Sequence, residues 1–103
     1  MNPEVLILYS RKGCCLCEAL ETRLLNISLS DLKPSIQLSI FDIDSEQVST
    51  DIKGKYMNEV PVIVLESNIL TRRIELPRVP PRLKEDLLLF WIQKKLNILY
   101  KKS

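Results

Sequence analysis

The chain has 103 residues, of which 46% are hydrophobic and 27% charged, which suits one domain, residues 1–103, with a real core. The net charge of +2 is smaller than nucleic-acid-binding domains usually carry, so we expect no nucleic acid partner. No apolar run approaches the roughly 20 residues that cross a bilayer, so we expect no membrane partner either.

The cysteines and the N-terminus indicate the compartment. Residues 1–4 carry no basic stretch, so we expect no secretory signal. The three cysteines are crowded into four positions, whereas a secreted disulfide framework would spread an even number along the chain. We therefore expect a cytoplasmic protein whose thiols are kept reduced.

The spacing of apolar residues predicts the elements in chain order. Strands are predicted at 5–9, 36–44, 60–65 and 69–76, and helices at 15–29, at 45–56, and from Pro80-Pro81 onward. The first two strands, joined by a helical crossover, should be parallel, and the last two should form an antiparallel hairpin. The order β-α-β-(α)-β-β-α predicts an α/β fold, a four-stranded mixed sheet with helices on both faces.

Cys14 and Cys17 form a Cys-x-x-Cys pair where a strand gives way to a helix, and three interpretations are open. A closed zinc site needs about four Cys or His ligands, and the chain has no histidine and three adjacent cysteines, so we expect no metal held by one chain. A cluster shared between two chains stays open. Cysteine also serves as a small buried apolar residue, which is the interpretation we favour for Cys15.

The third interpretation, a redox site, suits the Cys14/Cys17 pair best. The first turn of a helix has unpaired N–H groups and positive potential, which stabilise a thiolate. Arg11 and Lys12 add positive charge just upstream. Cys14 would lie exposed at the end of the loop and attack a disulfide, while Cys17, one helical turn later, would be shielded and resolve the mixed disulfide.

The stretch Tyr9-Ser10-Arg11-Lys12-Gly13-Cys14-Cys15-Leu16-Cys17 resembles the glutaredoxin active-site signature Tyr-Ser-Lys-x-x-Cys-Pro-Tyr-Cys. Val60-Pro61 resembles the Val–cis-Pro pair of thioredoxin-fold proteins, and the Cys-x-Leu-Cys form is similar to small glutaredoxin-like proteins. The resemblance implies a thioredoxin-like fold in which Cys14 is the nucleophile and Cys17 the resolving cysteine. It also implies that Arg11 faces the glycine carboxylate of glutathione, that the Val60 backbone pairs with the glutathione cysteine, and that Pro61 is cis.

The chain departs from the glutaredoxin pattern after the fourth predicted strand. Glutaredoxins usually carry a Gly-Gly pair and an Asp there, whereas residues 74–82 read IELPRVPPR, without glycine. Side chains at these positions would hinder the close backbone approach that glycine permits. Glutathione specificity is therefore less well supported than dithiol chemistry.

Basic side chains follow in the second half of the chain: Lys53, Lys55, Arg72, Arg73, Arg78, Arg82 and Lys84. They form either a rim that attracts anions to the thiol site or an ordinary solvated surface, since acidic residues are interspersed among them.

Our leading hypothesis is a monomeric thiol–disulfide oxidoreductase that reduces protein disulfides or glutathione mixed disulfides, with glutathione as a candidate co-substrate. Two alternatives are a glutathione-assisted module that binds an iron–sulfur cluster between two subunits, and a docking domain whose cysteines are idle.

Overall fold

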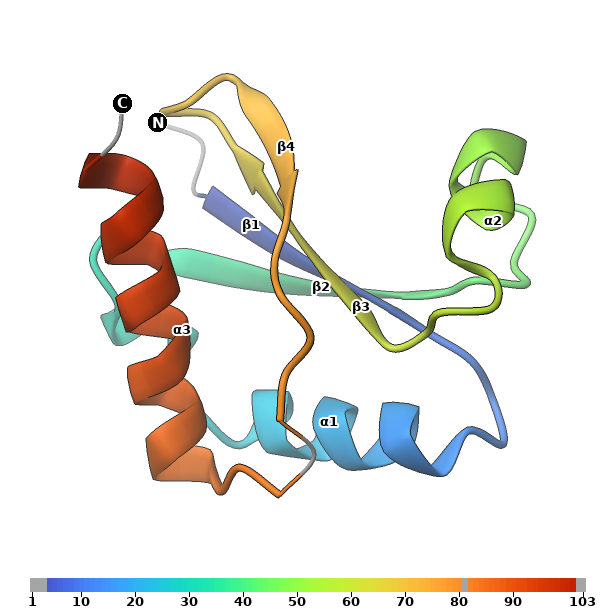
Figure 1. Ribbon diagram of the computed structural model, residues 1–103, viewed down its shortest axis with the longest axis horizontal. Helices are drawn as coiled ribbons and strands as arrows, with labels where there is room; N and C mark the ends of the chain where they lie inside the picture. The colour runs from blue at the N-terminus through green and yellow to red at the C-terminus, as the bar shows by residue number, and fades with distance from the viewer. Residues whose placement is uncertain (1–3, 81, 102–103) are drawn as a thin grey trace.

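The computed structural model describes residues 4–80 and 82–101, and Figure 1 shows its sheet with helices around it. The elements in chain order are β1 (Glu4–Ser10), α1 (Cys15–Leu25), a 3-10 turn η1 (Leu29–Asp31), β2 (Ile36–Asp42), α2 (Thr50–Tyr56), β3 (Val62–Ser67), β4 (Arg72–Glu75) and α3 (Glu85–Lys101).

The sheet has the strand order β2-β1-β3-β4. β1 and β2 are parallel, with Glu4 opposite Ile36 and Ser10 opposite Asp42. β3 is antiparallel to β1 and to β4, so β3 and β4 form the expected hairpin. The predicted fold class, a four-stranded mixed sheet in a thioredoxin-like α/β fold, is confirmed.

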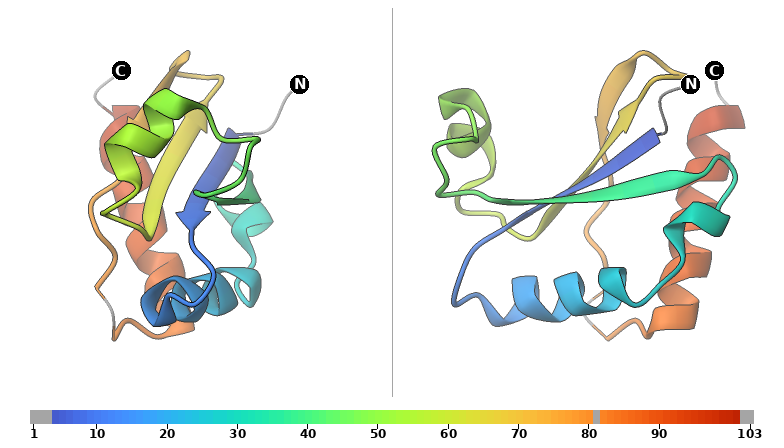
Figure 2. Two further views of the ribbon diagram at one scale, coloured as in Figure 1. Left: turned by 90° about the vertical axis from the view of Figure 1, so that its right-hand side faces the viewer. Right: turned by 180° about the vertical axis from the view of Figure 1, so that it is seen from behind.

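Alternate residues of β1 face opposite sides of the sheet and build two separate cores, because strand side chains have a period of two. Leu6 and Leu8 belong to the core that α1 and α3 cover, together with Leu24 of α1 and Ile92 of α3. Ile7 and Tyr9 face the other side, where Tyr56 of α2 joins them. Helices therefore lie on both faces, with α1 and α3 on one and the short α2 on the other (Figure 2).

Three helix boundaries differ from the prediction. α2 begins at Thr50 rather than at residue 45, because the Ser49 side chain accepts the Ile52 N–H and caps the helix there. α1 ends at Leu25 rather than residue 29, because the Asn26 N–H bonds to the Thr22 and Arg23 carbonyls and closes the helix. α3 begins at Glu85 rather than at Pro80-Pro81. The Pro80 carbonyl instead accepts the Leu83 N–H in a turn, which fits the extended conformation that proline imposes on the residue before it. Pro81 itself lies outside the described residues.

Candidate active site

The Cys-x-x-Cys pair lies at the start of α1, one turn beyond the end of β1. Gly13 has φ = +79°, a conformation that L side chains rarely adopt, and it turns the chain into the helix. Cys14 is the N-cap of α1, and its Sγ accepts a hydrogen bond from the Cys17 backbone N–H at 3.2 Å. The Cys14 sulfur thus takes the position that a Ser or Asp oxygen usually occupies at a helix start, where donors stabilise negative charge.

The three cysteines are all free and differ in exposure. Cys15 is exposed, so the prediction that it serves as a small buried apolar residue is wrong. Cys14 is half-buried, and Cys17 is completely buried. Burial, reinforced by a hydrogen bond to Cys14, raises the pKa of Cys17 to about 11. The Cys17 thiol is therefore protonated at neutral pH, directly behind the more accessible sulfur of Cys14.

The Arg11 guanidinium is held by a carboxylate of the chain itself. Its Nε and Nη2 groups donate to the two Asp44 carboxylate oxygens at 2.9 and 3.0 Å. This bidentate pair raises the pKa of Arg11 and lowers that of Asp44. Arg11 follows β1 and Asp44 follows β2, so the parallel register brings the two side chains to the same edge of the sheet.

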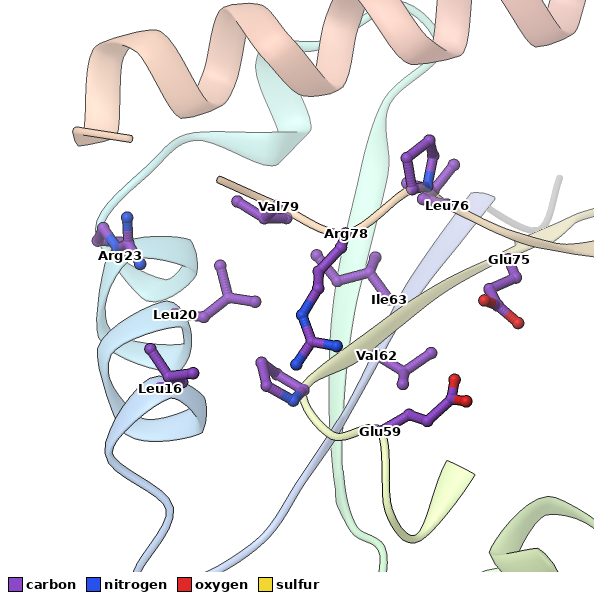
Figure 3. A pocket seen from close by; sticks show the side chains of 12 residues that line it. Leu16, Leu20, Arg23, Glu59, Val62, Ile63, Glu75, Leu76, Arg78 and Val79 are labelled. Atoms are coloured by element: carbon purple, nitrogen blue, oxygen red, sulfur yellow. The ribbon is translucent and has the colours of Figure 1, made fainter. Parts of the chain in front are cut away.

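A groove lies beside the cysteine pair, between α1 and the strands β3 and β4. It has a cavity volume of about 150 Å³. Its lining residues are Leu16, Leu20, Arg23, Glu59, Pro61, Val62, Ile63, Glu75, Leu76, Pro77, Arg78 and Val79, most of which Figure 3 labels. We call this cavity the α1–β3 groove. Leu16, which stands between Cys15 and Cys17, lines its helix side, and the Val60–Pro61 peptide bond at the start of the opposite wall is cis.

The structure places the five expected site residues in two groups. Cys14, Cys17 and Arg11 lie together at the β1–α1 junction, where the charge of Arg11 acts on the Cys17 sulfur. Val60 and Pro61 lead into β3, and of the five residues only Pro61 lines the α1–β3 groove.

Sequence reasoning missed Asp44 as the partner of Arg11. It also missed the groove residues other than Pro61. The signal for Asp44 was present, since acidic residues follow the strand expected to be parallel to the first.

The basic residues do not form one rim. Arg73 pairs with Glu66 at 3.2 Å, and the Lys55 ammonium lies 5.3 Å from the centre of the Tyr56 ring. Arg78 lines the α1–β3 groove. Most of this basic stretch is therefore ordinary surface, and Arg78 is the member that reaches the groove.

Within residues 4–80 and 82–101, no three His, Cys, Asp or Glu side chains come together as a metal site. None of the helices described has the length and apolar character needed to span a bilayer.

A four-stranded sheet of this order with a dithiol pair at the start of α1 defines a thioredoxin-fold protein. The family model for the glutaredoxin-like domain (DUF836) matches residues 5–93, and the chain belongs to this family. A solved structure described as "Structure of a malarial protein" has a similar fold, with a TM-score of 0.59 and 22% identity over 92% of this chain and 99% of that one. Comparison with curated proteins gives no match.

Proposed function

We propose that the chain is a thiol–disulfide oxidoreductase in which Cys14 is the nucleophile and Cys17 the resolving cysteine. The observation that carries the proposal is the unequal pair of sulfurs at the start of α1. Cys14 accepts the Cys17 N–H at the N-cap, while the Cys17 thiol is buried with its pKa raised to about 11. Membership of a glutaredoxin-like family supports a redox role of this kind.

The reaction has two exchange steps. The Cys14 thiolate attacks one sulfur of a substrate disulfide, forms a Cys14 mixed disulfide, and releases the other substrate sulfur as a thiolate that takes up a proton. Cys17 then loses its proton and attacks the Cys14 sulfur, which closes the Cys14–Cys17 disulfide and releases the second substrate thiol. The substrate gains two electrons, and the protein dithiol loses them.

The environment of Cys17 suits this order of events. Part of the elevation of its pKa comes from the hydrogen bond and the negative charge of Cys14. Once Cys14 is in a mixed disulfide, its sulfur no longer carries that charge, so the pKa of Cys17 falls. Cys17 becomes a better nucleophile at the step in which it must attack.

The substrates we propose are protein disulfides or glutathione mixed disulfides, and the reductant is a thiol such as glutathione or a thioredoxin. We place the reaction in the cytoplasm, where thiols are kept reduced, and expect the protein to work as a monomer.

Replacing Cys17 with Ser tests the assignment of roles. The variant cannot resolve the intermediate, so incubation with a disulfide substrate should leave a stable adduct on Cys14, read by intact mass and fragment ions. Cys15→Ser is the matched control, since it keeps the pair and should not accumulate the adduct. An adduct on Cys15 of the Cys17→Ser variant would contradict the assignment.

A further inference from the structure

The α1–β3 groove contains a cation, Arg78, that has no partner among the residues that the structure describes. Figure 3 shows the Arg78 side chain extending into the groove between Leu20 on α1 and Val62 on β3. Within the part of the chain that the structure describes, no residue forms a hydrogen bond or ion pair with the Arg78 guanidinium.

The other charged residues of the groove have different positions or partners. The Arg23 guanidinium donates to the backbone carbonyls of Ala19 and Leu83, so it ties the segment before α3 to α1. The Glu75 carboxylate lies near the Tyr56 hydroxyl and helps to raise the pKa of Tyr56. Neither Glu75 nor Glu59 is within ion-pair distance of Arg78, although both line the same groove.

Arg11, by contrast, does not line the groove. Its Nε and Nη2 groups donate to Asp44, so its charge is already paired with a carboxylate of the chain. A substrate carboxylate would have to compete with Asp44 for the bidentate edge of the Arg11 guanidinium. Arg78 carries the same chemistry without a competing partner, and it lies along the wall that begins at Pro61.

We infer that Arg78 is a specificity-determining residue that selects disulfide substrates carrying a carboxylate near the reacting sulfur. The inference rests on the proposed function. Guanidinium and carboxylate groups form two parallel hydrogen bonds, and the Arg78 side chain, although exposed, lines the groove beside the apolar residues Leu16, Leu20 and Val62. The carboxylate belongs either to a glutathionyl group or to an Asp or Glu beside the cysteine of a polypeptide.

Matched substrates separate these two sources. One pair is a short neutral peptide whose cysteine is joined to glutathione or to 2-mercaptoethanol, which has no carboxylate. The other pair is a peptide disulfide with Asp or Asn next to the cysteine. The wild type, Arg78→Ala and Arg82→Ala are compared by kcat/KM. Arg82 is a suitable control because its side chain is exposed, like that of Arg78, but does not line the groove.

We expect the wild type and Arg82→Ala to prefer a carboxylate-bearing substrate by about tenfold, through KM. Arg78→Ala should lose the preference, because its kcat/KM falls more on the carboxylate-bearing substrates than on the neutral ones. If the preference depends on Arg78 only in the glutathione pair of substrates, the recognised carboxylate belongs to the glutathionyl group. If it depends on Arg78 only in the Asp/Asn pair, the carboxylate belongs to the polypeptide. The inference would be overturned if the wild type showed no preference or if the preference survived in Arg78→Ala. It would also be overturned if Arg78→Ala lost as much kcat/KM on the neutral substrates as on the carboxylate-bearing ones.

A binding measurement keeps this test separate from the proposed function. S-methylglutathione and the S-methylated Asp peptide cannot exchange thiols, so their binding is followed by NMR shifts of groove residues without turnover. If the wild type reduces none of the substrates, the proposed function fails, and the binding data still decide the role of Arg78. Weaker binding to Arg78→Ala than to Arg82→Ala would support that role, and equal binding would overturn it.

Discussion

The protonation of Cys17 gives a prediction whose size follows from the structure. With a pKa of about 11, only about one Cys17 in a thousand is a thiolate at pH 8. An ordinary cysteine with a pKa of about 8.5 is about one quarter thiolate at the same pH. Because the thiolate is the reacting form, Cys17 in the folded protein should be alkylated about 200-fold more slowly than an ordinary cysteine, before its burial is considered.

The assay is alkylation of the reduced, folded protein with iodoacetamide between about pH 6 and pH 10, followed by mass spectrometry. All three cysteines fall in the tryptic peptide 13–23, so fragment ions must assign each site. Cys15, which is exposed, is the internal reference. The Cys17 rate should rise about tenfold per pH unit across the whole range, and unfolding in denaturant should make the three rates similar.

A Cys14→Ser variant separates the causes of the elevated pKa. Burial is the largest cause and persists in the variant, so Cys17 should still react far more slowly than Cys15. The contributions of Cys14 disappear, so the Cys17 rate should rise modestly over the wild type. A Cys17 rate that matches Cys15, or that levels off near pH 8, would refute the assignment of Cys17 as a shielded, protonated thiol.

Two stability predictions follow from other buried groups. Glu4 is buried and accepts hydrogen bonds from the backbone N–H groups of Asn68 and Ile69 at 2.8 Å each. Glu4→Gln should therefore lower the free energy of unfolding by about 2 kcal/mol in urea titrations, whereas the exposed control Glu46→Gln should change it little. Equal unfolding midpoints for the two variants would contradict this prediction. Burial and a neighbouring carboxylate raise the pKa of Tyr56 to about 12, so the neutral phenol stabilises the fold fully below about pH 10 and loses that contribution between pH 10 and 12. Over that interval the wild type should therefore lose about 2–3 kcal/mol more than Tyr56→Phe, and parallel pH profiles of the two proteins would count against it.

The fold could be predicted from sequence because its determinants are local. Strand β1 is a continuous apolar run, and apolar residues recur at helical spacing along α1. These two patterns predict a βαβ unit with parallel strands. Helix ends were less accurate, since Asn26 closes α1 through backbone hydrogen bonds that no periodicity reveals. The proline-rich segment before α3 forms a turn for a similarly local reason.

The candidate site was only partly predictable. The Cys14/Cys17 pair and Val60-Pro61 stand out as motifs, because their residue types and spacing are themselves the signal. The Arg11–Asp44 pair depends on the register of two strands, and the position of Arg78 depends on the path of the chain after β4. Such contacts join residues far apart in sequence, and the types of the residues alone do not specify them.

The most direct test of the proposed function is the steady-state reduction of a neutral disulfide substrate by the wild type, Cys14→Ser and Cys15→Ser, with an external thiol as reductant. The wild type and Cys15→Ser should turn over, and Cys14→Ser should fall to the uncatalysed rate, because the attacking sulfur is lost. A Cys14→Ser variant as active as the wild type, or a wild type no faster than the reductant alone, would contradict the assignment of this chain as a dithiol oxidoreductase.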